Sequence, residues 1–588
     1  MGEWIEPGKE RYGLNWPGKA ECMRVIQTPS IGTLRPRRDQ SVSFDATDNL
    51  IIEGDNLEVL KLLQKSYYGK VKMIYIDPPY NTGKEFIYPD NYREGLQDYL
   101  KFSGQLDAAG LKVSANTETS GRYHSKWLSM MYPRLYLARN LLRDDGVIFV
   151  SIDDCEAHNL RCLANEVFGE ENFVDSIVWK KRYGGGAKEK YLVTIHEYVL
   201  MYARNKTDIE ELFVPLSDES IERYYKNRDE YYALRGPFRT HPLESMKSFE
   251  ERRNLVFPIQ APDGTQVMPK RQWRWSKERV AHALNRGELA FLKDKNGEWA
   301  VHTKQYLKDQ GETRQTKFFS VIDDVYTQHG TNEIIEIFGD AQVFGFPKPS
   351  RLVRKLVGLA TDTNDGDLIL DFFAGSGTTA QAVLDLNVED GGDRKFILVQ
   401  LPEKTEHPQY PTIADICRER VRRVIQKLDT EDAAKDSLGL DKRQPRGYKA
   451  LQLTSSNFHV WDGDAEKIKN IEDQLKLFAQ HVEPGRTDED LLYEILPKGG
   501  FTIDSHIEKL SLAGKVVFSV ADGALLLCLD RELTLEVIEA MVNRVPAPAQ
   551  IICLDAGFQG NDQLKVNAVQ TVKSRNRLKE GDLVFQVV

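Results

Sequence analysis

The tetrapeptide Asp77-Pro78-Pro79-Tyr80 follows the apolar residues 71–76 and is the part of the sequence best suited to chemistry. Proline fixes φ and cannot continue a sheet ladder, so two prolines make a rigid turn that holds the Asp77 carboxylate and the Pro78 carbonyl in place. The exocyclic amine of adenine is a poor nucleophile because its lone pair is delocalised, and two acceptors on its N–H bonds favour the pyramidal, nucleophilic geometry. Tyr80 offers a face for a flipped-out base, a contact worth about 1–3 kcal/mol in single-strand sites. The tetrapeptide therefore predicts activation of a base amine, although Asp-Pro-Pro also ends strands that have no such role.

A glycine-rich loop at residues 371–379 follows a predicted strand and opens a predicted helix. Its two glycines, Gly375 and Gly377, allow a tight turn and let a ligand approach the backbone closely. The loop lacks the full G-x-G-x-x-G pattern of dinucleotide sites, because Ala380 stands at the third glycine position. Alone it predicts a turn that admits a nucleoside, and only its combination with the tetrapeptide in one chain narrows the class of ligand.

Alternating strands and helices must position these two motifs. The strand patterns cover residues 50–53, 71–76, 147–152, 367–372 and 395–401, and the helical patterns cover residues 56–64, 126–143, 350–360 and 378–386. Such alternation predicts an α/β fold with a Rossmann-like parallel sheet, helices on both faces, and ligands at the carboxyl ends of the strands. Because both motifs come directly after strands, we expect them at that edge of the sheet.

The predicted core is interrupted in the sequence. Residues 205–340 are rich in charged and aromatic residues and show no sustained helical or alternating period, which indicates an inserted domain. A C-terminal α+β unit has strand patterns at 515–520, 524–529 and 550–554 and a helical pattern at 533–543. The predicted division is an N-terminal extension at 1–48, the two halves of the core at 49–204 and 341–445, the insert at 205–340, and the C-terminal domain at 446–588.

Composition is typical of a globular protein with several domains. The 588 residues are 41% hydrophobic and 29% charged, with a formal net charge of −10, so any affinity for nucleic-acid phosphates must come from local patches. Residues 1–19 lack the apolar run of a signal peptide, and no stretch approaches the roughly 18 apolar residues of a membrane helix, which predicts a cytoplasmic protein. The six cysteines form no C-x-x-C pair, and the histidines near the tetrapeptide lack metal-ligand spacing, so no metal site is expected.

The two motifs together resemble those of the β-group of N6-adenine DNA methyltransferases, in which the Asp-Pro-Pro-Tyr motif precedes the recognition insert and the glycine motif follows it. More narrowly, residues 49–401 resemble the modification subunit of a type III restriction-modification system, and the C-terminal unit resembles the tail of such subunits more loosely. The segments that carry this resemblance are Gly54-Asp55-Asn56-Leu57, Ile152-Asp153-Asp154, His196-Glu197-Tyr198, Trp273-Arg274-Trp275-Ser276 and Phe346-Pro347-Lys348-Pro349.

The resemblance implies site-specific transfer of a methyl group from S-adenosylmethionine to N6 of an adenine flipped out of duplex DNA, with Asp77, Pro78, Pro79 and Tyr80 as catalytic residues. No metal is required, since displacement at a sulfonium needs positioning and no activated water. The implied partners are double-stranded DNA, a second copy of the chain, and a helicase-nuclease restriction subunit. The C-terminal domain is expected to serve dimerisation or partner binding.

The same resemblance implies cofactor contacts. Asp55 accepts from the adenine amine of the cofactor, Phe346 and Lys348 contact its methionine end with Lys348 near the carboxylate, and the loop around that end comprises Asp371, Phe373, Gly375 and Gly377. Gln400 stands where an acidic residue commonly holds the ribose hydroxyls, and Glu403, three residues further on, is the alternative ribose contact.

Two further segments have a structural and a functional interpretation. Trp273, Arg274 and Trp275 are interpreted as part of a core, with DNA contact as the alternative. The basic, glycine-rich residues 180–186 are interpreted either as a solvated surface loop or as a loop that follows phosphates or closes over a flipped base.

Three other functions stay open at this point. N4-cytosine methylation needs the same activation of an exocyclic amine, and only family analogy favours adenine where Asp occupies position 77. A catalytically idle recognition subunit of a restriction complex would keep the insert and lose cofactor binding. RNA methylation is the third, and the large insert favours a duplex DNA substrate over it.

Overall fold

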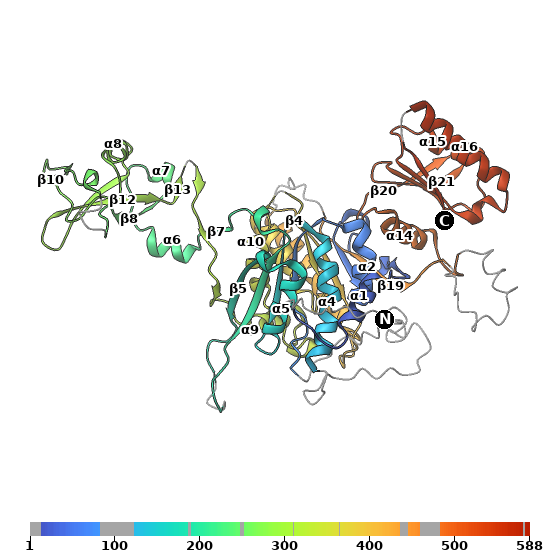
Figure 1. The fold of residues 1–588 in the computed structure, drawn as a ribbon, viewed down its shortest axis with the longest axis horizontal. Helices are drawn as coiled ribbons and strands as arrows, with labels where there is room; N and C mark the ends of the chain where they lie inside the picture. The colour runs from blue at the N-terminus through green and yellow to red at the C-terminus, as the bar shows by residue number, and fades with distance from the viewer. Residues whose placement is uncertain are drawn as a thin grey trace, which may run out of the picture. The chain divides into compact units, whose positions relative to one another are not determined.

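The computed structural model describes residues 13–82, 123–185, 190–246, 252–309, 311–363, 365–435, 445–458, 482–579 and 582–588. The chain divides into two compact units. The larger unit comprises Met1–Glu210 and Phe319–Val588, and the smaller unit, Glu211–Phe318, is inserted between these two segments and is drawn mainly in green in Figure 1.

A ten-stranded mixed sheet forms the centre of the larger unit. Six neighbouring strands, in the order β19-β2-β18-β17-β3-β4, run parallel. At one edge β1 pairs antiparallel with β19, and at the other β6 lies antiparallel between β4 and β5, which pairs in parallel with β16. The predicted α/β fold with a parallel core is confirmed. In sheet order the strands are β1 (Gly32–Pro36), β19 (Lys449–Ser455), β2 (Leu50–Glu53), β18 (Lys395–Gln400), β17 (Leu368–Asp371), β3 (Val71–Ile76), β4 (Leu142–Ile152), β6 (His196–Ala203), β5 (Phe173–Lys180) and β16 (Val321–Ile322).

Two groups of helices pack with this sheet, as a doubly wound fold requires. Contacts link α1, α2, α4, α5 and α14 in one group and α9, α10, α11 and α12 in the other; Figure 1 shows α1, α2 and α4 side by side in blue to cyan. The core strands are almost continuously apolar because both faces are covered. The helices are α1 (Lys19–Gln27), α2 (Asn56–Tyr67), α4 (Tyr123–Leu141), α5 (Ala157–Phe168), α9 (Thr327–Phe338), α10 (Ser350–Ala360), α11 (Thr378–Asp390), α12 (Ile413–Lys435) and α14 (Asp488–Gly499).

The order of the strands brings the two motifs together. β17 and β3 are parallel neighbours, with Ile369 opposite Met73 and Leu370 opposite Ile74. The tetrapeptide follows the carboxyl end of β3, and the glycine loop follows the carboxyl end of β17. Two segments on opposite sides of the insert in the sequence therefore lie next to each other at one edge of the sheet.

The inserted unit has a small core of its own beside the three-stranded antiparallel sheet β11-β12-β8. Trp273 belongs to this core, is 2% exposed, and donates its indole N–H to the Phe257 carbonyl at 2.7 Å. The alternative that Trp273 contacts DNA is therefore wrong, because burial leaves its ring no face for a base. The unit contains β7 (Phe213–Pro215), α6 (Asp218–Tyr224), α7 (Tyr232–Arg235), β8 (Phe238–Pro242), β9 (Ile259–Gln260), β10 (Gln266–Val267), α8 (Lys277–Asn285), β11 (Leu289–Lys293), β12 (Trp299–Tyr306), β13 (Lys308–Asp309), β14 (Glu312–Thr313) and β15 (Gln315–Lys317).

The C-terminal sheet has the order β20-β21-β22-β23-β24 and packs with two helices. It begins later than the predicted boundary at residue 446, because β19 pairs between β1 and β2 and belongs to the central sheet. Among the described residues, no helix is long and apolar enough to cross a membrane. The elements are β20 (Ile507–Leu512), β21 (Lys515–Val520), β22 (Leu525–Cys528), α15 (Leu535–Val542), β23 (Gln550–Cys553), α16 (Asp562–Lys579) and β24 (Val584–Val587).

Candidate active site at the ends of β3 and β17

Asp77, Tyr80, Glu197 and Lys348 form a polar cluster directly after β3. The Lys348 ammonium lies 3.0 Å from Asp77 Oδ1 and 3.2 Å from Glu197 Oε2, and it donates to the Tyr80 hydroxyl at 2.6 Å. The Tyr80 hydroxyl donates in turn to Glu197 Oε2 at 3.1 Å. The side chains of Lys348 and Glu197 are 12% and 9% exposed, whereas that of Asp77 is 27% exposed. The cluster is therefore largely internal, and Asp77 is more accessible than Lys348 or Glu197.

Glu197 is not among the site residues predicted from the sequence. Glu197 is the second residue of β6, which runs antiparallel to β4 with Tyr198 opposite Ile152. The start of β6 consequently lies at the edge where the parallel strands end. The local signals were an acidic residue at the start of a largely apolar strand and its place in His196-Glu197-Tyr198, one of the segments that carry the family resemblance. Lys181, from the predicted basic loop, pairs with Glu197 Oε1 at 2.9 Å; residue 186 of that loop lies outside the described residues.

The charges of this cluster depend on one another. Burial raises the pKa of Asp77, and Lys348 offsets this only in part. Burial also acts to raise the pKa of Glu197, but Lys348 and Lys181 outweigh it and the pKa is lowered overall. Burial acts to lower the pKa of Lys348, but Asp77 and Glu197 outweigh it and the pKa is raised. At neutral pH the cluster therefore holds an ammonium on Lys348 and a carboxylate on Glu197.

The tetrapeptide and the residue after it are held by α4 and by Glu156, the N-cap residue of α5. The indole N–H of Trp127 donates to the Pro79 carbonyl at 2.7 Å. Asn81, in a left-handed conformation with φ 62°, donates its amide to the fully buried carboxylate of Glu156. His124 Nδ1 lies 2.7 Å from the same carboxylate. These contacts fix the turn at Pro79 and at the residue after Tyr80.

The glycine loop is organised by Asp371. Its carboxylate accepts from the Phe373 backbone N–H at 3.0 Å and from the Thr379 hydroxyl, and burial raises its pKa to about 7. Gly377 has φ 84°, and a Cβ there would lie 3.1 Å from Cys417 Sγ. Both the backbone angle and the neighbouring thiol therefore require glycine at position 377.

A buried ion pair supports this loop from α12. Arg420, which is fully buried, donates to the hydroxyls of Ser376 and Thr378 at 2.7 and 2.8 Å and pairs with Glu333 Oε2 at 2.9 Å. Glu333 also accepts from the backbone N–H of Ser350 at 3.0 Å and from its hydroxyl at 2.8 Å. The pair thus joins α9, the start of α10 and the glycine loop. Neither Arg420 nor Glu333 is among the site residues predicted from the sequence.

Two of the predicted cofactor residues, Asp55 and Phe346, differ strongly in exposure. Asp55 Oδ1 caps α2 by accepting from the backbone N–H groups of Leu57 and Glu58 at 3.0 and 3.1 Å, and its side chain is 15% exposed. Phe346 is 99% exposed with φ 57°. Their predicted contacts with a cofactor stay predictions.

Gln400 and Glu403 differ in their freedom to bind a ligand. The Gln400 side chain accepts from the Gly375 backbone N–H at 2.7 Å and donates to the Leu401 carbonyl at 3.1 Å, so both ends of its amide are engaged. Glu403 makes no side-chain ion pair within the described part of the chain, and burial alone raises its pKa to about 7. Of the two, Glu403 is the better candidate for a ligand contact.

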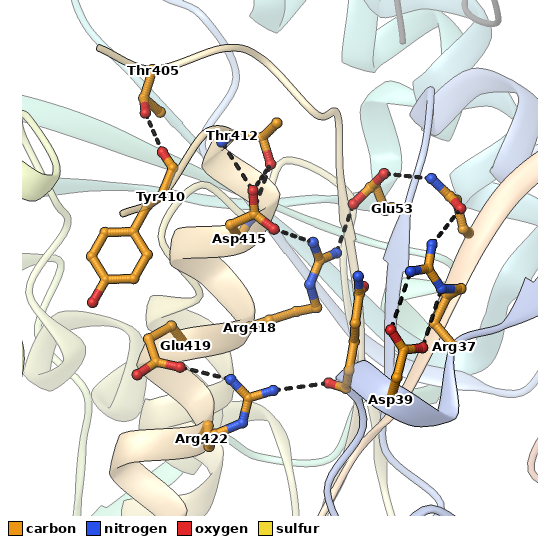
Figure 2. A network of polar contacts seen from close by, with 12 residues as sticks. Arg37, Asp39, Glu53, Thr405, Tyr410, Thr412, Asp415, Arg418, Glu419 and Arg422 are labelled. Atoms are coloured by element: carbon orange, nitrogen blue, oxygen red, sulfur yellow. Dashed lines mark hydrogen bonds and ion pairs between the residues drawn. The ribbon is translucent and has the colours of Figure 1, made fainter. Parts of the chain in front are cut away.

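A polar network joins the start of α12 to the end of β2 (Figure 2). Asp415, near the start of α12, accepts from the backbone N–H and the hydroxyl of Thr412 at 3.0 and 2.7 Å. Arg418 pairs with Asp415 at 2.6 Å and with Glu53 at 2.8 Å. Glu53 is the last residue of β2, and Glu403 lies in the loop after β18, the strand next to β2. The network therefore connects the end of this loop to the end of β2.

The residues around this site match a known family. The sequence profile of the DNA methylase family covers residues 71–407, which include the tetrapeptide, Glu197, Lys348 and the glycine loop. The chain belongs to the DNA methylase family. The methylase is 35% identical to the type III restriction-modification enzyme StyLTI Mod subunit of Salmonella typhimurium, over 81% of this chain and 72% of that protein. It is 30% identical to the EcoP15I Mod subunit of Escherichia coli, over 99% of this chain and 92% of that protein.

Among solved structures, the complex of M1.HpyAVI with SAM covers 63% of the methylase and 98% of its own chain, at 14% sequence identity. The TM-score of this match is 0.29.

Proposed function

We propose that the methylase transfers a methyl group from S-adenosylmethionine to N6 of an adenine in duplex DNA. The observation that carries this proposal is that the tetrapeptide and the glycine loop follow adjoining parallel strands. A pair of acceptors for an amine thus lies beside a turn that admits a nucleoside. Asp at position 77 favours adenine over cytosine by family analogy.

In this proposal the Asp77 carboxylate and the Pro78 carbonyl accept hydrogen bonds from the two N–H groups of the target amine, and the ring of Tyr80 stacks on the base. The adenine must leave the duplex because its N6 is paired inside it. Asp77 suits this role because burial raises its pKa even beside Lys348, so hydrogen bonds donated by the amine would stabilise its carboxylate. The contacts of Pro79 and Asn81 keep the two acceptors in place without a bound base.

The residues after β17 and β18 fit S-adenosylmethionine. Gly375 and Gly377 both have positive φ, and only glycine adopts such a turn without cost while leaving the backbone open to a ligand. Bound there, the cofactor supplies the sulfonium methyl group. We propose that Asp55 accepts from its adenine amine, that Glu403 rather than Gln400 accepts from its ribose, and that the methionine end lies near Phe346, Asp371, Phe373, Gly375 and Gly377.

The test is transfer of tritiated methyl from S-adenosylmethionine to a mixed-sequence plasmid, followed by nucleoside analysis. N6-methyladenine is expected with the wild type, and Asp77→Ala should lower the rate by at least about 100-fold, as expected for loss of a group that acts in the transition state. Asp175→Ala, at an exposed position of β5, is the matched control. N4-methylcytosine as the product would keep the mechanism and overturn the base.

Two rivals give other results. An idle recognition subunit would bind duplex DNA and transfer no label, and it would show no affinity for S-adenosylmethionine. An RNA methylase would be inhibited far more by RNA than by duplex DNA in a competition assay. The intact tetrapeptide and glycine loop favour the enzyme over the idle subunit.

We also propose partners that follow from this function. The relatives are named as subunits of type III restriction-modification enzymes, so a helicase-nuclease restriction subunit is the expected partner and the cytoplasm the expected compartment. The C-terminal sheet is the proposed surface for dimerisation or partner binding. Light scattering of the purified chain, with and without residues 500–588, tests the homodimer.

A further inference from the structure

Lys348 already pairs with the Asp77 carboxylate, the hydrogen-bond acceptor that a target amine would need. Its ammonium lies 3.0 Å from Asp77 Oδ1, which is the distance at which a base amine would donate to the same oxygen. It also lies 4.7 Å from the centre of the Tyr80 ring, the surface proposed for stacking the base. A carboxylate oxygen can accept from two donors, but Asp77 Oδ1 is buried and Lys348 lies directly against it, so a base amine reaches this oxygen only if Lys348 moves aside.

Glu197 provides a second position for this ammonium. Its Oε2 lies 3.2 Å from Lys348 Nζ, while its Oε1 is held by Lys181 at 2.9 Å. An ammonium that is only 12% exposed cannot be left unpaired without a large desolvation cost. Because Glu197 contacts Lys348 already, the ammonium needs only a small rotation of its stem to give up Asp77 and keep one ion pair.

We propose that Lys348 fills the amine position of the active site before DNA binds, and that Glu197 is the positioning residue that takes over its ammonium when the target base arrives. This inference rests on the proposed amine methylation and deepens it. It also assigns Lys348 to the side of the methyl acceptor instead of the cofactor carboxylate. The lowered pKa of Glu197, to which both lysines contribute against the effect of burial, agrees with a permanently charged partner.

Glu197→Gln tests the proposal because it keeps the shape of the side chain and removes its charge. The ammonium should then stay on Asp77, so kcat/KM for plasmid DNA should fall by about 10- to 100-fold. The dissociation constant for S-adenosylmethionine should not change. Glu166→Gln is the matched control, because it also removes the charge of a carboxylate that pairs with a lysine, Lys19, at 2.7 Å. It should leave both quantities at wild-type values.

The second variant combines Glu197→Gln with Lys348→Met, which removes the occupant together with its partner. The kcat/KM of the double variant should be at least about tenfold higher than that of Glu197→Gln, since Asp77 is then open to the amine. Fluorescence of 2-aminopurine, placed at the methylated position once the plasmid assay has located it, should rise in parallel as the base flips. A purely structural role for Glu197 would give no recovery.

Three results would overturn the inference: wild-type kcat/KM in Glu197→Gln, no recovery in the double variant, or a large loss of affinity for S-adenosylmethionine in Lys348→Met alone. The last result would indicate that Lys348 contacts the cofactor, as the family resemblance implies. Failure of the underlying function is distinguishable, because in that case the wild type itself would yield no methylated adenine.

Discussion

The buried pair Arg420–Glu333 allows a quantitative prediction about the glycine loop. At 2.9 Å, the attraction between the two charges is about 6 kcal/mol at an effective dielectric constant of 20. Desolvation of the fully buried guanidinium takes back several kcal/mol. The net coupling between the two side chains should therefore be about 2–3 kcal/mol.

A double-mutant cycle with Arg420→Met and Glu333→Gln measures this coupling. Each single variant leaves a buried charge without its partner and should lower the free energy of unfolding by about 3–5 kcal/mol. The double variant should lose about 2–3 kcal/mol less than the sum. Because Arg420 also holds Ser376 and Thr378, its variant should weaken S-adenosylmethionine binding more than the Glu333 variant does.

Urea unfolding gives these energies where circular dichroism and tryptophan fluorescence report coincident transitions, and calorimetric titration gives the cofactor affinity. Strict additivity of the two substitutions would refute the reasoning, since it would mean that the pair contributes no energy as a pair. Unchanged cofactor affinity in Arg420→Met would refute the proposed support of the loop.

Three further predictions follow from single residues. Gly377→Ala should weaken S-adenosylmethionine binding at least tenfold in titration calorimetry, because position 377 has φ 84° and its new Cβ would lie 3.1 Å from Cys417 Sγ; Gly391→Ala, at another positive φ but with open space, is the control. Burial raises the pKa of Glu403 to about 7 in the folded protein, above its ordinary value. Glu403 therefore makes its full contribution to the free energy of unfolding below its ordinary pKa, and this contribution is lost as the pH rises through about 7. Glu403→Gln should therefore be more stable than the wild type at pH 8 in thermal unfolding without cofactor, and it should abolish the tightening of cofactor binding expected between pH 6 and pH 8; equal stabilities and a retained pH dependence would exclude this role. Trp127→Phe removes the 2.7 Å hydrogen bond to the Pro79 carbonyl and should lower kcat several-fold with unchanged cofactor affinity, and an unaltered kcat would show that the turn keeps its geometry without that bond.

The sequence alone was sufficient for the elements that carry the two motifs. The predicted strands 50–53 and 71–76 and the predicted helix 350–360 coincide with β2, β3 and α10. These elements are specified by the period of their apolar residues and by prolines and glycines at their ends, which act locally along the chain. The tetrapeptide and the glycine loop carry a family signal for the same reason: each is a short turn whose chemistry is written in adjacent residues.

Only the tertiary structure decided which distant side chains meet. Neighbouring positions for β3 and β17, the place of Lys348 on Asp77, and the second position that Glu197 offers all depend on contacts between residues far apart in the chain. The engagement of Gln400 by the glycine loop, which leaves Glu403 as the candidate ribose contact, is of the same kind. No local period encodes such contacts, because they arise from the order and direction of strands in the sheet and from the requirement that buried charges find partners.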